Sequence, residues 1–256
     1  SANMEAVKSF FKRSLLKTKI SSLYAIMMFT SVISLYGQQG RLRENNHLFP
    51  HPVNSTMGIP DPIGSFNIRL NALRQQTTDG VEYDLSGHLG YGLFEWGGIH
   101  LRSLGVKTTP FTEVIGMVGL WRNKERTQGI SLLGIIGIPT GAKKEGQHHG
   151  LAYLFGFAGR IVKEDFMTND VILHYDFSAA HFIAETGTVV KLSPILFTTL
   201  DLRGTFGGSR PDITILPSVK WKVIDSGFIA FGFQAPLTKS TSFKNQVIVQ
   251  IELGSH

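Results

Sequence analysis

The chain has 256 residues, a formal net charge of +6 and no cysteine. Before Gly37 there are five cationic residues and one acidic residue, a net charge of +4, so the rest of the chain carries only +2. This weak excess, without a long basic block, excludes nucleic acid as the expected partner. The lack of cysteine excludes disulfides, thiolate catalysis, cysteine-ligated zinc and a lipid-modified amino-terminal cysteine.

Residues 4–37 have the pattern of a leader for secretion. A cationic stretch precedes an apolar core from Ile20 to Tyr36, and polar residues follow it. This pattern predicts a signal peptide that is removed, with a retained helix as the alternative. Residues 1–3 and 254–256 resemble additions to the natural chain and are set aside.

Residues 38–63 are polar and rich in proline, so we expect an irregular arm rather than a helix or a central strand. This arm would lie loose in the periplasm or fold into the mouth of a barrel as a plug, and its plug residues would be His47, Pro50, His51 and Pro52. His47 and His51, with Met57 nearby, could form a soft metal site. Pro50 between the two histidines opposes that alternative, and a polar arm is the preferred interpretation.

From about Gly64 to Leu253, apolar and polar residues alternate in a way that is typical of strands. Phe66, Ile68 and Leu70, for example, alternate with polar neighbours on both sides. Segments 111–121 and 129–138 are apolar on both faces and follow this pattern less well. The pattern predicts an all-β fold, an antiparallel transmembrane β-barrel of about twelve strands within a range of about ten to fourteen, which forms one domain over residues 64–253.

Alternation alone does not separate a membrane barrel from a soluble barrel or sandwich. The second face carries many charged residues and histidines, which suit a wet lumen, while the aromatic residues of the first face suit lipid. A soluble all-β domain remains the alternative. The residues expected to line the lumen are Arg69, Asp84, His88, His100, Arg102, Arg160, His174, Asp176, Lys220, Lys222 and Glu252.

Two segments resemble a known family. The phrase LLGIIGIPTGAKKEG, with Pro139, Thr140 and Gly141, and the closing segment ILPSVKWKVIDSGFIAFGFQAPLTKSTSFKNQVIVQIEL are similar to outer-membrane transporters of the phenol-degradation (MetA-like) family. This resemblance implies a barrel that passes small, often aromatic or apolar, compounds. Barrels of this kind usually end in an aromatic assembly signal, whereas this segment ends in Leu253.

His174, Asp176 and Ser178 are expected on one face of a strand, and they are the residue types of nucleophilic hydrolysis. Because this face points to the lumen rather than to lipid, a polar lining is the preferred interpretation. His148 and His149 lie in a charged loop and are weak candidates for metal or anion binding. The sequence therefore predicts neither a catalytic centre nor a cofactor.

The predicted function is that of a channel in a bacterial outer membrane for passive uptake of a small, apolar or aromatic solute, with the arm as a partial plug. The expected partners are membrane lipid, lipopolysaccharide and the solute itself. A structural barrel that binds a protein partner at its mouth without transport is the first alternative. A lipid-modifying barrel enzyme is the second.

Overall fold

The structure, a computed structural model, describes residues 49–54, 58–77, 80–103, 111–140, 150–163, 166–208, 210–238 and 243–255. All of them belong to the second of two compact units of the chain, Arg43–His256. The expected leader and residues 38–48 of the arm lie outside the described residues. No helix in the described part of the chain is long and apolar enough to cross a membrane.

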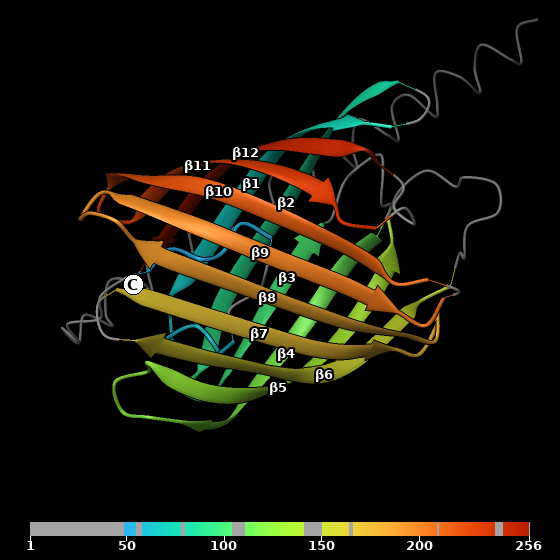
Figure 1. Cartoon of the computed structure of the whole chain (residues 1–256). Helices are drawn as coiled ribbons and strands as arrows, with labels where there is room; N and C mark the ends of the chain where they lie inside the picture. The colour runs from blue at the N-terminus through green and yellow to red at the C-terminus, as the bar shows by residue number, and fades with distance from the viewer. Residues whose placement is uncertain are drawn as a thin grey trace, which may run out of the picture. The chain divides into compact units, whose positions relative to one another are not determined.

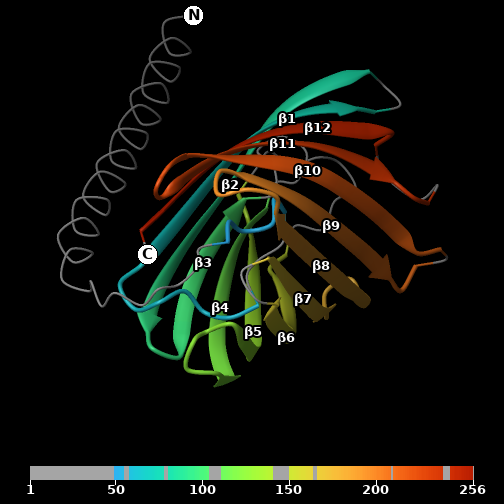
Figure 2. The same cartoon turned by 60° about the vertical axis from the view of Figure 1, so that its left-hand side comes forward.

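The described residues form twelve antiparallel strands that close into one barrel (Figures 1 and 2). The strands are β1 (Phe66–Gln76), β2 (Val81–Phe94), β3 (Gly97–Ser103), β4 (Phe111–Arg122), β5 (Gln128–Pro139), β6 (Ala152–Lys163), β7 (Met167–Asp176), β8 (His181–Lys191), β9 (Leu196–Phe206), β10 (Asp212–Ile224), β11 (Gly227–Pro236) and β12 (Asn245–Ser255). Each strand pairs with its neighbours in sequence, and β1 closes the ring on β12 with Phe66 opposite Ser255. The expected twelve-stranded barrel is confirmed, and β12 extends two residues beyond Leu253.

The strands alternate between buried and exposed side chains because successive residues of a strand point to opposite faces. In β1, Asn67 and Arg69 are buried inside the barrel while Leu70 is exposed on its outside. Closure pairs the backbone of every strand, which a lipid environment requires. The exposed apolar side chains of the strands include Leu70, Leu85, Phe155, Phe157, Leu173, Tyr175, Phe231, Phe233 and Ile251.

The two ends of the barrel differ. The start of β1 and the end of β12 lie at the same end, where short turns such as 95–96 and 225–226 join the strands. At the other end the connections span up to twelve residues, 140–151. Short turns are typical of the periplasmic end of an outer-membrane barrel and longer loops of the extracellular end.

Aromatic residues gather on the outside near both ends. Trp96, Trp121 and Trp221 are exposed near the short-turn end, and Tyr83 and Tyr153 near the other. Such pairs of girdles mark the two interfaces of a membrane. The closed barrel, the apolar exterior and the girdles are those of a protein of the bacterial outer membrane, as the sequence predicted.

The inside of the barrel is not polar throughout, and its apolar part includes the segments 111–121 and 129–138, which are apolar on both faces in the sequence. Strands β4 to β8 turn a cluster of apolar side chains inward, and these side chains pack against one another. The members of this cluster are Ile115, Met117, Leu133, Ile135, Leu154, Ala158, Ile172 and Ile183. Buried polar and charged side chains line the rest of the interior, and some of them, Glu113, Arg160, Asp170, His174 and Glu185, also lie on β4 to β8.

Candidate functional site: the lumen and the arm inside it

The first described limb of the arm, residues 49–54, lies inside the ring of strands (blue in Figures 1 and 2). The backbone N–H of His51 donates to Glu252 Oε1 at 3.1 Å, and His51 Nδ1 lies 2.8 Å from the same oxygen. The ammonium group of Lys220 donates both to the His51 carbonyl and to the other oxygen of Glu252. Because a carboxylate only accepts hydrogen bonds, Nδ1 of His51 carries a proton. We call His51, Lys220 and Glu252 the latch.

The next two residues of the limb are held through their backbone groups. Arg69 Nη1 donates to the carbonyl of Pro52 at 3.0 Å. The N–H of Val53 donates to Asp201 Oδ2 at 3.1 Å, and the side-chain amide of Gln250 donates to the Val53 carbonyl at 2.9 Å. An extended segment without a strand partner needs such side-chain partners when it is buried. The polar residues of β1, β9 and β12 supply them.

An aromatic cluster holds the beginning of the limb. Phe49 meets the edge of Phe197 with ring centroids 6.4 Å apart, and Phe197 meets Phe228 at 5.7 Å. Val189 completes this buried cluster. The limb therefore combines an apolar anchor at Phe49 with the charged latch two residues later.

The second limb, residues 58–63, lies against other strands. The N–H of Gly58 donates to Asp170 Oδ1 at 2.8 Å, and Ser131 Oγ donates to the Gly58 carbonyl at 3.0 Å. Arg160 holds the two oxygens of Asp170 with two bonds of 2.9 Å. A Cβ at residue 58 would lie 2.1 Å from the carbonyl oxygen of Gly159, so only glycine fits this close approach.

A chain of imidazoles lies between the two limbs. Arg69 contacts His88 Nδ1, and His88 Nε2 lies 3.0 Å from His100 Nδ1. A guanidinium group only donates, so we assign the proton of His88 to Nε2, which donates to His100. His100 Nε2 then carries its proton toward Asp61 of the arm, 3.8 Å away. His88 is therefore neutral, and the arm adds a carboxylate to the end of the chain.

Four charged residues cross the lumen from one wall to the other. Arg102 on β3 is opposite Glu113 on β4, and its Nε donates to Glu113 Oε2 at 2.6 Å. Glu185 on β8 is opposite Arg203 on β9, with an Oε1 to Nη1 distance of 3.4 Å. Arg102 Nη1 and Glu185 Oε2, which are 3.9 Å apart, connect the two pairs. We call these four residues the charged bridge.

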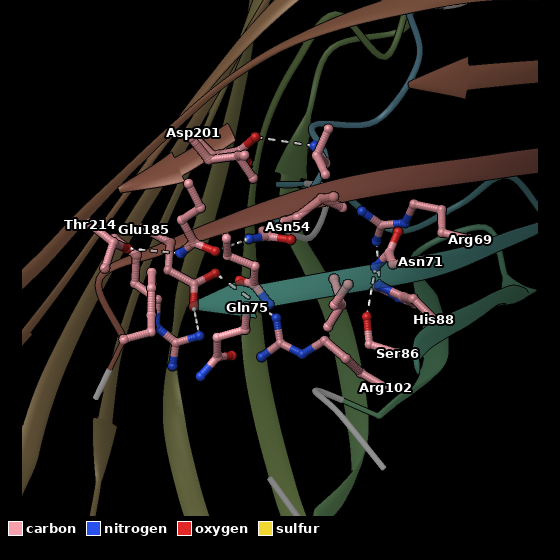
Figure 3. A pocket seen from close by; sticks show the side chains of 18 of the residues that line it. Asn54, Arg69, Asn71, Gln75, Ser86, His88, Arg102, Glu185, Asp201 and Thr214 are labelled. Carbon is pink, nitrogen blue, oxygen red and sulfur yellow. Dashed lines mark hydrogen bonds and ion pairs between the residues drawn. The ribbon is translucent and has the colours of Figure 1, made fainter. Parts of the chain in front are cut away.

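A cavity of about 380 Å³ lies beside the charged bridge, and we call it the vestibule (Figure 3). Val53 and Asn54 of the arm border it, together with side chains of β1 to β3 and β8 to β12. Its charged side chains are Arg69, Arg102, Arg203, Glu185, Asp201 and Asp212, and its amides are Asn54, Asn71, Gln75, Gln234 and Gln246. Leu73, Leu216 and Ile248 add an apolar patch that packs against Val53.

The structure places the residues that the sequence proposed for the lumen as follows. Those buried on the inside are Arg69, Asp84, His88, His100, Arg102, Arg160, His174 and Lys220, with Glu252. Lys222 is only half-buried and pairs with Asp225 at the short-turn end at 3.1 Å. Asp176 lies at the end of β7 and is also half-buried. His174 is buried on β7 opposite Ile183 of the apolar cluster.

The proposed trio His174, Asp176 and Ser178 does not share one strand face, which corrects that expectation. β7 ends at Asp176, and Ser178 belongs to the turn that follows. Asp176 Oδ1 accepts from the N–H groups of Ser178 and Ala179, at 2.8 and 3.1 Å, so it caps the turn. The Ser178 hydroxyl accepts from the N–H of Tyr153 at 3.1 Å. These residues shape a turn.

Of the proposed plug residues, Pro50, His51 and Pro52 lie buried in the first limb. His47 lies outside the described residues, as do Met57 and the two candidate metal-binding histidines His148 and His149. In the part of the chain that the structure describes, no group of three or more histidine and acidic residues could hold a metal ion.

The sequence interpretation missed four acidic residues that organise the interior. Glu113, Asp170, Glu185 and Asp201 are buried and accept from, or pair with, the arm or the arginines. All four follow the same alternation of inward and outward residues that identified Arg69, so this alternation could have identified them too. Which partner each acid meets depends on how the barrel closes.

The sequence matches no protein family and no curated protein in the comparisons made. The structure is similar to several solved outer-membrane proteins. The COG4313 outer membrane channel from Pseudomonas putida F1 has a TM-score of 0.60 and 10% identity, over 79% of this chain and 99% of that chain. The KdgM porin has a TM-score of 0.57 and 12% identity, over 74% and 99%. The NanC porin has a TM-score of 0.52 and 6% identity, over 74% and 98%.

At these identities the likeness shows the fold alone. The barrel is of the kind found in outer-membrane porins and channels. Membership in the narrower MetA-like family stays a prediction.

Proposed function

We propose that this protein is an outer-membrane channel through which a small solute passes passively, and that the arm is its plug. The observation that carries the proposal is the vestibule, a cavity of about 380 Å³ inside the closed barrel that is bordered by the arm. Small-molecule sites are typically concave spaces of a few hundred cubic ångströms with a few convergent polar groups. The similar folds of porins and channels support this function.

The way in which the arm is held supports a removable plug. Its two limbs are bound by side chains of the wall, and the strands keep their own pairing. Release of the arm would therefore leave the hydrogen bonds between the strands of the barrel intact. Ile63, which makes an isolated bridge to Gly92 directly before β1, would remain the tether.

The sequence led us to expect an apolar or aromatic solute, and we keep this as part of the proposal. Leu73, Leu216 and Ile248 offer an apolar patch in the vestibule, next to a row of amides. A solute with an apolar face and hydrogen-bonding groups would match both. Membrane lipid and lipopolysaccharide would be the partners of the outer surface.

Deletion of residues 38–61 tests the proposal and leaves the turn between Pro62 and Ser65 in place. In planar bilayers the full chain should show small or brief conductance, and the deletion variant a larger and steadier one. Swelling of liposomes in neutral solutes of graded size gives the cut-off. A phenyl glucoside compared with maltose separates an aromatic preference from a size limit. Equal conductance of the two proteins would contradict the plug.

A barrel that binds a protein partner without transport is the second candidate. The packed apolar cluster on β4 to β8 favours it, because these side chains fill space that a solute would need. If the deletion variant passed neither ions nor solutes, this second candidate would replace the channel.

A further inference from the structure

The charged groups of the vestibule balance one another. Three arginines, Arg69, Arg102 and Arg203, are matched by three acids, Glu185, Asp201 and Asp212. The remaining titratable side chain of the lining is His88, which is neutral because its Nδ1 accepts from a guanidinium group. The lining therefore carries no formal net charge.

Five of these six charges are also engaged with partners. Arg69 holds the Pro52 carbonyl, and Asp201 holds the N–H of Val53. Arg102 is shared by Glu113 and Glu185, and Arg203 lies against Glu185. A channel that selects ions usually presents uncompensated rings of one sign. This vestibule presents pairs instead.

Glu185 is the residue on which the balance depends. It is only 5% exposed and lies between Arg102 and Arg203. Arg102 has a second acid, Glu113, whereas the ion pair of Arg203 is with Glu185. Without Glu185, the two arginines would face the vestibule with an excess of one positive charge.

The polar groups that face the vestibule without formal charge include five amides and four hydroxyls. Gln75 on β1 is opposite Gln246 on β12, which is opposite Gln234 on β11, so three amides lie side by side across neighbouring strands. Gln234 also donates to the hydroxyl of Thr214 at 3.2 Å. Each amide offers both a donor and an acceptor. Such a row matches the hydroxyl or carbonyl groups of an uncharged ligand.

We infer that the vestibule selects uncharged, hydrogen-bonding solutes against ions of either sign, and that Glu185 sets this selectivity by neutralising Arg102 and Arg203 across the lumen. The inference rests on the proposed channel and names its class of solute. A charged solute would have to enter a charge-balanced space and draw a paired residue away from its partner. An uncharged solute exchanges its water for the amides without disturbing any pair.

The test uses the full chain in phosphatidylcholine liposomes, whose headgroups carry no net charge. Uptake of labelled galactose is compared with uptake of galacturonate and of protonated galactosamine, three solutes of similar size. We expect galactose to enter at least about tenfold faster than either ion, a modest figure for a solute that disturbs a buried ion pair. Equal or faster entry of either ion through the wild-type channel would overturn the inference.

Two variants with opposite expectations exclude a merely structural effect. Glu185→Gln should raise uptake of galacturonate relative to galactosamine, and Arg203→Gln should raise galactosamine relative to galacturonate. Glu125→Gln, in an exposed turn, makes the same change in total charge as Glu185→Gln and should leave the ratio unchanged. The reversal potential in a KCl gradient should shift in opposite directions for the two lumen variants. Shifts in the same direction, or none, would refute the role of Glu185.

The two proposals fail in different ways. If none of the three sugars enters through the wild-type protein, the two lumen variants or the variant that lacks residues 38–61, the channel itself is refuted. If the sugars enter but without discrimination by charge, the channel stands and its selectivity for uncharged solutes is wrong.

Discussion

Replacement of Lys220 by methionine should release the arm. Lys220 is fully buried and is shared by the His51 carbonyl and the Glu252 carboxylate. Methionine keeps most of the apolar stem but removes the charge, so Glu252 stays buried with the arm on top of it and without its cation. When the arm leaves, water reaches Glu252 and the penalty disappears. The substitution therefore destabilises the closed state alone.

The size of the effect follows from the burial of the pair. Removal of one partner from a buried ion pair costs about 3–5 kcal/mol. Glu252 keeps three other donors, the N–H and Nδ1 of His51 and the amide of Asn67 at 3.2 Å, so we expect the lower end of this range. At about 1.4 kcal/mol per factor of ten, the equilibrium between seated and released arm shifts by roughly two orders of magnitude.

Single-channel recording gives the open fraction, and limited proteolysis of the arm gives an independent measure of its release. Lys222→Met is the matched control, since Lys222 lies on the same strand face but pairs with the fully exposed Asp225. Exposed pairs contribute little to stability, so this variant should behave like the wild type. Unchanged open fraction and unchanged protease resistance in Lys220→Met, or the same change in both variants, would refute the reasoning.

Three further predictions concern the contacts that hold the arm inside the barrel and the side chains on the outside of the barrel. Gly58→Ala places a Cβ 2.1 Å from a backbone oxygen, so the arm should become protease-sensitive and conductance should rise, whereas Gly134→Ala, with open space around its Cβ, should have no effect. Phe49→Ala should also raise the open fraction, because truncation of a buried aromatic costs about 3–5 kcal/mol. The gel mobility of the unheated, folded barrel should stay unchanged. Phe157→Lys, at the middle of β6 and facing outward, should destabilise the barrel by about 2–4 kcal/mol in urea unfolding from liposomes, and Ile161→Lys near the end of the strand by less; equal losses would contradict the membrane position.

The sequence predicted the barrel because most strands show one polar and one apolar face. Arg69, for example, lies between two apolar neighbours in β1 and points inward as expected. Strands β4 and β5 lack this contrast, because their inward residues, such as Ile115 and Leu133, are as apolar as their outward ones. In these two strands the sequence therefore does not show which of the two apolar faces points into the barrel.

The partners inside the barrel could not be predicted from local pattern. Glu252 meets His51, 201 residues away in sequence, and Arg102 meets Glu185 from the opposite wall. Such pairs depend on how the barrel closes and on its cross-section. The alternation of inward and outward residues along one strand does not show either. The trio at the end of β7 failed for a related reason, because alternation does not show where a strand ends and Ser178 enters a turn.

The place where His51 and Pro52 bind has a consequence for the assembly of the barrel. Arg69 belongs to the first strand and Glu252 to the last, and the two are direct register partners at the seam where β1 meets β12. Before that seam forms, Arg69, which holds Pro52, is not beside Lys220 and Glu252, which hold His51, so the binding place of the arm is incomplete. We therefore expect the arm to dock only after the barrel has closed. A spectroscopic probe on the arm would then report, in real time, when the assembly machinery releases the closed barrel.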